Sequence, residues 1–210
     1  MNTLQAGFGR VNVNPMMGLP MRGYFKPRFT EAILDDLEIN ALALACGDTK
    51  LLLMSLDCCA MDTKDAERFV KNIAEATGLP EEAIITHATH THTSTSIGFT
   101  AENDLVREYT EFLNKRFIDA ANFALADLKP AKMGYGIGHA PNIAFVRRFR
   151  MKDGSVRTNP GVDNPDILHP IGDVDERVNV VRFDREGGDS VVLVNFGDHP
   201  DVVGGCKISD

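Results

Sequence analysis

Two apolar segments joined by a turn constrain the fold of this chain most strongly. Residues 37–45 and 51–56 are almost continuously apolar, and the Gly47-Asp48-Thr49-Lys50 segment between them is typical of a hairpin turn. Continuous apolar runs of this length are characteristic of strands that are buried on both faces. The sequence therefore predicts a hairpin in a sheet that is covered on both sides.

Helical and extended patterns alternate along the rest of the chain. Asp62 is predicted to cap a helix that ends before Gly78, and a second helix is predicted over residues 104–128, ended by Lys129-Pro130. The second helix carries an apolar stripe that we expect to be buried: Leu105, Tyr109, Phe112, Leu113, Phe117, Ala120, Ala121 and Ala124. Further strands are predicted at residues 6–14, 83–85, 131–139, 143–149, 177–183 and 190–196, with loops at 15–27 and 151–176. This order predicts a single-domain α/β fold with mixed β-sheets and flanking helices.

Length and composition limit the class of protein. A chain of 210 residues accommodates one domain of ordinary size, so we assign residues 1–210 to one domain. The segment from Gly204 to Asp210 follows a site-like loop without a closing element, so we expect an incomplete portion of a larger catalytic domain. A net charge of −8 argues against nucleic acid as a partner, and no apolar run is long enough for a transmembrane segment. Four cysteines without CxxC spacing, and an N-terminus without a signal peptide, predict a cytoplasmic protein. The sequence does not indicate the oligomeric state.

Three of the six histidines lie close together, directly after the strand predicted at residues 83–85. In extended chain, side chains two residues apart point to the same side, so His90 and His92 are predicted to converge. Neutral imidazole is the commonest ligand for metals such as zinc, and this pair would supply two nitrogens from one strand end. His87 has the opposite parity and is interpreted as a structural residue.

A second histidine stands at another predicted strand end. The apolar segment 191–196 is followed at once by Gly197-Asp198-His199-Pro200, and strand ends are where α/β folds place ligands. A catalytic zinc takes about three protein ligands and leaves one position open. His90, His92 and His199 could supply all three, or one of them could orient the others.

Other polar residues leave alternatives open. Asp57 and Asp198 could bind a metal or orient an imidazole, and Asp57 is equally consistent with a turn or helix-capping residue. Arg147-Arg148 could bind a carboxylate, phosphate or carbonyl group, or could be solvated strand residues. Cys58-Cys59 is interpreted as a pair of small packed residues.

These segments together resemble the neutral/alkaline non-lysosomal ceramidase family, in its N-terminal domain. The similarity spans essentially the whole chain and includes residues 6–15, Thr89-His90-Thr91-His92, Arg147-Arg148 and residues 195–200. The resemblance implies a zinc-dependent amidase that cleaves the N-acyl bond of ceramide-like lipids. It implies His90 and His199 as metal ligands, His92 as a catalytic neighbour of the reacting amide, and Arg147 in the substrate cleft. Further zinc ligands of the family, a Glu and a Tyr, would fall beyond Asp210, so we expect the isolated 210-residue chain to bind metal weakly and to be inactive.

The sequence also departs from the family pattern. The family's His-Thr-His is usually followed by Ser-Gly-Pro, where this chain has Thr93-Ser94-Thr95, and Val146 stands where an Asn often precedes the arginine. These departures favour a second hypothesis, a ceramidase-like binding or accessory domain without catalysis. A third is a non-haem iron or manganese enzyme using His90, His92 and a carboxylate such as Asp57 or Asp198.

Overall fold

The chain folds into two compact units. The computed structural model describes residues 3–199 and 201–210. The first unit comprises Met1–Met133, Phe183–Val191 and Pro200–Asp210, and the second comprises Gly134–Arg182 and Val192–His199. The predicted α/β class, with mixed sheets and flanking helices, is confirmed.

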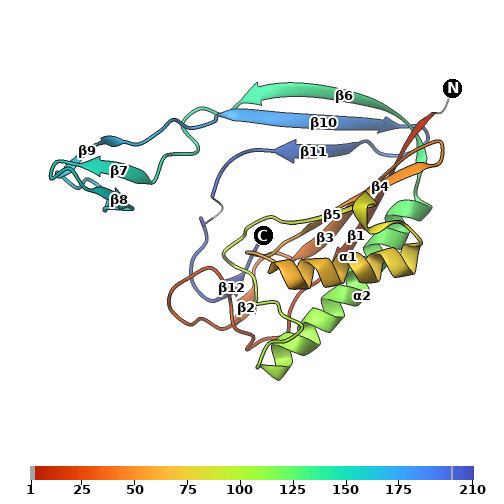
Figure 1. Ribbon diagram of the computed structural model, residues 1–210, viewed down its shortest axis with the longest axis horizontal. Coiled ribbons are helices and arrows are strands. Elements are labelled where there is room, and N and C mark those ends of the chain that lie inside the picture. Colours follow the sequence, from red (N-terminus) through yellow and green to blue (C-terminus); the bar gives the residue numbers. More distant parts are fainter. Residues whose placement is uncertain (1–2, 200) are drawn as a thin grey trace. The chain divides into compact units, whose positions relative to one another are not determined.

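The main sheet has seven strands in the order β11-β10-β6-β1-β3-β4-β5 (Figure 1). Strands β3 and β4 form the predicted antiparallel hairpin, in which Cys46 pairs with Thr49 around the turn at Gly47 and Asp48. Strand β1 pairs antiparallel with β3, whereas β4 and β5 run parallel, so the sheet is mixed. The strand bounds are β1 Leu4–Asn12, β3 Glu38–Cys46, β4 Thr49–Leu56, β5 Ile84–Ala88, β6 Lys129–His139, β10 Arg177–Arg185 and β11 Val191–Asn195.

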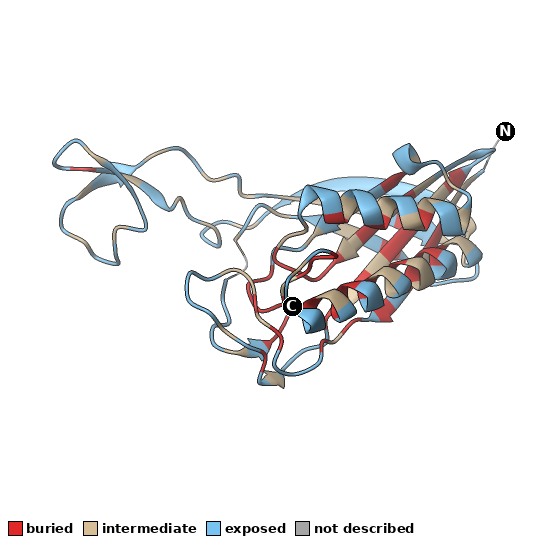
Figure 2. Cartoon of the chain, turned by 60° about the horizontal axis from the view of Figure 1, so that its bottom comes forward, coloured by how far each residue is buried: buried red, intermediate tan, exposed pale blue. Residues whose placement is uncertain are grey.

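Two helices pack on one face of this sheet in the first unit (Figures 1 and 2). Helix α1 (Thr63–Thr77), followed by the short helix η1 (Glu81–Ala83), makes the crossover that the parallel pair β4 and β5 requires. Helix α2 (Asp104–Ala126) begins after Asn103, whose side chain caps it. Asp62 does occupy the N-cap position of α1, but its carboxylate pairs with Arg22 at 2.9 Å and makes no capping hydrogen bond.

None of the helices in the described part of the chain is both long and apolar enough to cross a membrane.

The buried stripe of α2 differs from the predicted one in two places. Leu105 and Phe112 are 40% and 39% exposed, and Val106 and Thr110 are buried instead. The predicted stripe was built from apolar residues alone, so it could not include the polar residue Thr110. Its hydroxyl donates to the carbonyl of Val106 at 2.7 Å and accepts from the amide of Gly98 at 2.9 Å, so burial leaves it fully hydrogen-bonded.

The sheet is not covered equally on its two faces. Leu52, Met54 and Leu56 of β4 are fully buried beneath the helices. On the opposite face Leu51 and Leu53 are half-buried and Ile85 is 48% exposed, and none of the helices among residues 3–199 and 201–210 packs there. The expectation of two covered faces, drawn from continuous apolar runs, is therefore wrong for this part of the structure.

Two glycines of β1 allow α2 to approach the sheet closely. A Cβ atom on Gly7 would overlap the carbonyl oxygen of Ala124 and lie 2.8 Å from the amide nitrogen of Leu128. A Cβ atom on Gly9 would overlap the carbonyl oxygen of Ala120. Strand and helix backbones are therefore in direct contact here, which only glycine permits.

The second unit contains a small sheet of its own. Strand β7 (Arg148–Met151) pairs antiparallel with β8 (Val156–Thr158) and with β9 (Ile167–Pro170). The predicted loop at 151–176 thus contains two short strands, and the strand predicted at 143–149 begins only at Arg148. Strands of three or four residues are too short to give a periodic signal. In the first unit, β12 (Lys207–Ile208) pairs parallel with β2 (Ala32–Ile33).

Asp127, at the C-terminal end of α2, connects the helix to the sheet. Its carboxylate accepts a hydrogen bond from the amide of Phe8 at 3.1 Å and pairs with Lys129 and Arg185. Burial raises the pKa of Asp127, but these three donors outweigh that effect and lower the pKa to about 2. A carboxyl group whose pKa is lower in the folded state stabilises the fold above its unfolded pKa, near 3.9, and loses this contribution as the pH falls through about 2.

We therefore expect Asp127→Asn to lower the free energy of unfolding at pH 7 by about 1 kcal/mol, a figure reduced for solvent screening of a partly exposed group. Urea unfolding at pH 7 and at pH 2.5 measures it, and the difference from wild type should shrink at the lower pH. Asp119→Asn, which removes an exposed pair with Arg116 on α2, is the matched control and should change stability by less than about 0.5 kcal/mol. An equal effect of Asp127→Asn at both pH values would contradict the assignment.

Candidate metal centre

The two histidines of the His90-Thr91-His92 segment converge, as predicted, but not through strand geometry. Strand β5 ends at Ala88, and His90 has a φ of +69°, in the left-handed region. The two side chains therefore do not converge because they are two residues apart in an extended strand, which was the reason given for the prediction. The turn nevertheless places the Nε2 atoms of His90 and His92 3.2 Å apart, with the rings edge to face.

Hydrogen bonds from the end of β4 hold His90 in this unusual conformation. The amide of His90 donates to the carbonyl of Cys58 at 2.9 Å, and its ring Nδ1 lies 2.7 Å from the carbonyl oxygen of Cys59. A carbonyl oxygen only accepts, so Nδ1 carries the proton, and in the neutral imidazole this leaves Nε2 with the lone pair. A positive φ in a non-glycine residue costs about 1–3 kcal/mol, and such strain is concentrated at functional sites.

Cys59 completes a cluster that the sequence did not reveal. One ligand atom each from Cys59, His90 and His92 lie within 4.8 Å of one another, and Cys59 and His92 are buried. The residues meet because β4 and β5 are parallel neighbours, with Leu56 beside Ala88, so that the segments after both strands leave the sheet at the same edge. The interpretation of Cys59 as a packing residue missed this, since no sequence spacing connects it to the histidines.

Burial dominates the titration of the groups next to the cluster. Burial raises the pKa of the Cys59 thiol, and the Arg22 and Arg28 guanidinium groups partly oppose it. Burial raises the pKa of Cys58 to about 12. Burial likewise raises the pKa of Asp57 to about 6, although its carboxylate accepts a hydrogen bond from the amide of Glu38 at 2.8 Å. Asp57 is not part of the cluster, which favours the turn interpretation of this residue.

The loop predicted at residues 15–27 packs against His92. A Cβ atom on Gly23, which has a φ of +109°, would lie 2.8 Å from the ring Nδ1 of His92. Tyr24 meets the same imidazole edge to face, with the ring centroids 5.9 Å apart. Arg28 stacks on Tyr24 at 3.8 Å and donates to the carbonyl oxygen of His92 at 2.6 Å. Sequence reasoning gave these three residues no role, although they fix the position of His92.

The last residues of the chain contact the histidine segment. The hydroxyls of Thr91 and Thr93 donate to the carbonyl oxygen of Ser209 at 2.9 and 2.8 Å, and the amide of Ser209 donates to the carbonyl of Thr93 at 3.2 Å. The side chain of Ser209 in turn donates to Asp35 at 2.7 Å. The two threonines therefore face away from the cluster and serve to hold the chain.

The other predicted site residues lie in the second unit. The amide of His199 donates to the Asp198 carboxylate at 2.8 Å, and the His199 side chain is half-buried. Arg147 is exposed, and its carbonyl accepts from the amide of Asn159 at 2.9 Å. The roles of His199 and Arg147 in a shared site remain predictions. His87, His139 and His169 are exposed and lie outside the cluster.

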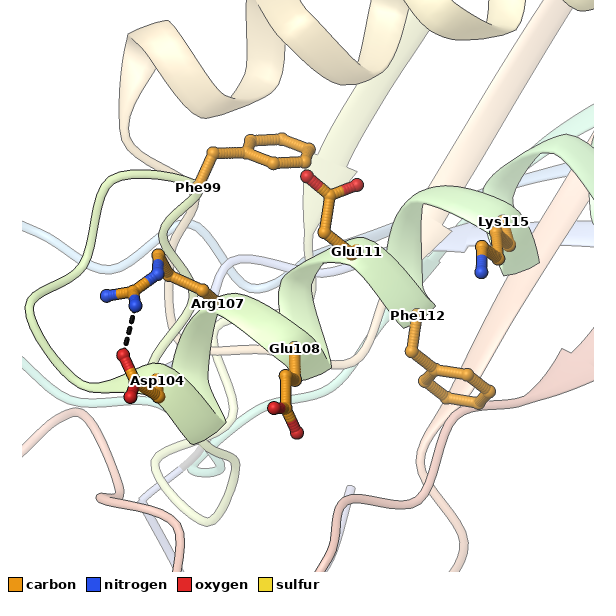
Figure 3. Close-up of a pocket in the computed structure, with 7 residues that line it drawn as sticks. All are labelled: Phe99, Asp104, Arg107, Glu108, Glu111, Phe112 and Lys115. Carbon is orange, nitrogen blue, oxygen red and sulfur yellow. Dashed lines mark hydrogen bonds and ion pairs between the residues drawn. The ribbon is translucent and has the colours of Figure 1, made fainter.

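A separate depression on the surface of α2 holds none of these residues (Figure 3). Three of its charged side chains form ion pairs: Arg107 pairs with Asp104, and Glu111 pairs at 3.2 Å with Arg68, which lies outside the depression. The remaining lining residues are Phe99, Glu108, Phe112 and Lys115. The depression thus has the character of a solvated helix surface.

The fold is similar to that of a part of neutral ceramidase. The crystal structure of neutral ceramidase from Pseudomonas aeruginosa matches 95% of this chain and 32% of its own chain, with a TM-score of 0.69 and 17% sequence identity. A structure described as ceramidase complexed with C2 matches 95% of this chain and 32% of its own, with a TM-score of 0.66 and 18% identity. No protein-family model matches the chain, and no curated protein matches it in sequence. The predicted resemblance is confirmed at the level of the fold, and the chain spans about a third of the length of these proteins.

Proposed function

We propose that this protein is a zinc-dependent hydrolase of the ceramidase type, which cleaves the N-acyl amide bond of a ceramide-like or other N-acyl substrate. The observation that supports this most is the cluster of Cys59, His90 and His92, two of them buried, in a chain with a ceramidase-like fold. The proposal includes residues 1–210 as one ceramidase-like domain, a cytoplasmic location, a small-molecule or lipid amide as substrate and no nucleic acid partner.

The residues of the cluster fit a zinc ion. Imidazole nitrogen and thiol sulfur are ligands that zinc accepts and that magnesium and calcium do not favour. The Nδ1 hydrogen bond to the Cys59 carbonyl is the outer-shell contact that usually orients a metal-binding histidine. The Nε2 atoms of His90 and His92 lie 3.2 Å apart, so a cation held by Nε2 of His90 would lie next to the ring of His92.

The proposed roles come from the resemblance, and the local geometry supports those of His90 and His92. His90 holds the cation through Nε2, and His199 is proposed as a second ligand. When bound, zinc lowers the pKa of a water molecule to about 7 and polarises the amide carbonyl. His92 presents a ring nitrogen to the amide, as a proton donor or as a hydrogen-bond donor to the developing oxyanion. Arg147 is proposed to bind a polar group of the substrate in the cleft.

A non-catalytic binding domain is the second candidate. It is favoured by the replacement of the family's Ser-Gly-Pro with Thr93-Ser94-Thr95, in which Thr93 holds Ser209. Such a domain would keep the metal and lose the hydrolysis.

Metal analysis combined with an amide hydrolysis assay tests the proposal. We expect about one zinc per chain in the zinc-loaded protein and chelator-sensitive release of fatty acid from an N-acyl sphingosine or a shorter N-acyl amine. His90→Ala should lose the zinc. His92→Asn should keep the zinc and lower kcat by about 10²–10⁴-fold, as expected for a proton donor, whereas loss of zinc would make His92 a ligand. Zinc without hydrolysis would support the binding domain, and a wild-type protein that takes up no zinc-class metal would contradict both candidates.

A further inference from the structure

We propose that Cys59 binds the same cation as His90, so that the metal centre of this protein has a sulfur ligand as well as nitrogen ligands. This inference rests on the proposed function and adds a ligand that the resemblance did not imply. The support for it is the position of Cys59, its burial and the hydrogen bonds of its backbone.

The backbone of Cys59 is fixed on both sides by the histidine segment. Its amide donates to the hydroxyl oxygen of Ser94 at 3.0 Å, and its carbonyl accepts from the His90 ring at 2.7 Å. Ser94 is itself buried and two residues after His92. The same hydrogen bond that turns Nε2 of His90 toward the cluster therefore also fixes where the Cys59 side chain begins.

The separation of the ligand atoms leaves room for a cation. On a tetrahedral zinc, with bonds of about 2.3 Å to sulfur and 2.0–2.1 Å to nitrogen, the sulfur and nitrogen atoms lie about 3.6 Å apart. The ligand atoms of Cys59 and His90 lie within 4.8 Å of one another, a limit that includes this value. The Cys59 side chain is only 6% exposed, so the sulfur is shielded from bulk water.

The neighbouring cysteine has a different environment and provides a natural comparison. Cys58 is 2% exposed and packs in the apolar core beside Leu56, which suits an inert thiol. Cys46 is exposed near the hairpin turn. Neither belongs to the cluster. Of two consecutive thiols, therefore, one faces the core and the other faces the histidines.

A sulfur ligand restricts the metals that this site would bind tightly. Thiolate and imidazole together favour zinc and its substitute cobalt over magnesium, calcium and manganese, which prefer oxygen ligands. The protein should accordingly select zinc or cobalt from a mixture that contains excess magnesium.

Cobalt(II) substitution tests the ligand directly, with no need for substrate. The cobalt-loaded protein should show a near-ultraviolet sulfur-to-cobalt charge-transfer band. Cys59→Ser and Cys59→Ala should abolish this band and weaken cobalt binding by about tenfold or more, since loss of even an outer-shell partner costs 10–100-fold. Cys46→Ser and Cys58→Ala are the matched controls and should retain the band. Far-ultraviolet circular dichroism checks that each variant is folded.

Two results would overturn the inference, and they differ from failure of the proposed function. Cobalt bound by the wild-type protein without the charge-transfer band would exclude a sulfur ligand, whether or not any variant folds. A band that survives in folded Cys59→Ser, or that disappears in folded Cys58→Ala, would assign the sulfur elsewhere. If the wild-type protein binds no cobalt or zinc at all, the proposed metal-dependent function fails as well.

Discussion

Gly7→Ala is expected to lower the free energy of unfolding by about 3 kcal/mol or more. The new Cβ would overlap the carbonyl oxygen of Ala124 and lie 2.8 Å from the amide nitrogen of Leu128. Both neighbours are backbone atoms at the C-terminal end of α2, so no side chain can rotate away to make room. Relief requires lifting the helix from β1, and with it buried residues such as Phe117 and Leu113.

Urea or thermal unfolding followed by circular dichroism measures the effect. Gly136→Ala is the matched control, because Gly136 also lies in a strand of the main sheet but a Cβ atom there would meet no heavy atom within 4 Å. Alanine there should be neutral or stabilising by up to about 0.5–1 kcal/mol, since glycine loses more conformational freedom on folding. Equal stability of the two variants would mean that α2 does not contact β1 as described.

The same glycines show how far sequence alone could predict the fold. Alternation in residues 6–14 correctly indicated a strand, and the Gly47-Asp48 turn correctly indicated a hairpin. Nothing in the alternation indicates that Gly7 and Gly9 lie under a helix, because that is a distance between segments far apart in the chain. The apolar run at 51–56 likewise predicted a strand covered on both faces. The apolar residues of a strand show that both of its faces could be buried, but not that another segment packs on each face.

The sequence was sufficient to predict the two histidines of the site, but not the residues around them. His90 and His92 were recognisable because they are close in sequence and follow an apolar strand. Cys59 was not, because it approaches them only through the parallel pairing of β4 with β5. The left-handed turn at His90 could not be anticipated either, since its support comes from the carbonyl groups of Cys58 and Cys59.

Gly23→Ala is expected to impair the site although it leaves every proposed ligand and His92 itself in place. The new Cβ would lie 2.8 Å from Nδ1 and 2.9 Å from Cγ of the His92 ring. The ring must move, because the carbonyl of His92 is held by Arg28 and one side of the imidazole faces Tyr24. A displacement of about 1 Å at a reacting group can cost about 10²-fold in rate, so we expect kcat for amide hydrolysis to fall by about that factor.

Gly18→Ala separates this effect from backbone strain. Gly18 lies in the same loop and also has a positive φ, +83°, but a Cβ there would meet no atom within 4 Å. Both variants should lose about 1 kcal/mol of stability from the left-handed conformation, and only Gly23→Ala should alter turnover. The nitrogen and proton resonances of the His92 imidazole, compared in the two variants, report the displacement without any assay of activity. If both variants reduce turnover equally, or if the His92 resonances are unchanged in Gly23→Ala, then the loop does not position His92, and the buried imidazole must be held by the strand-end segments alone.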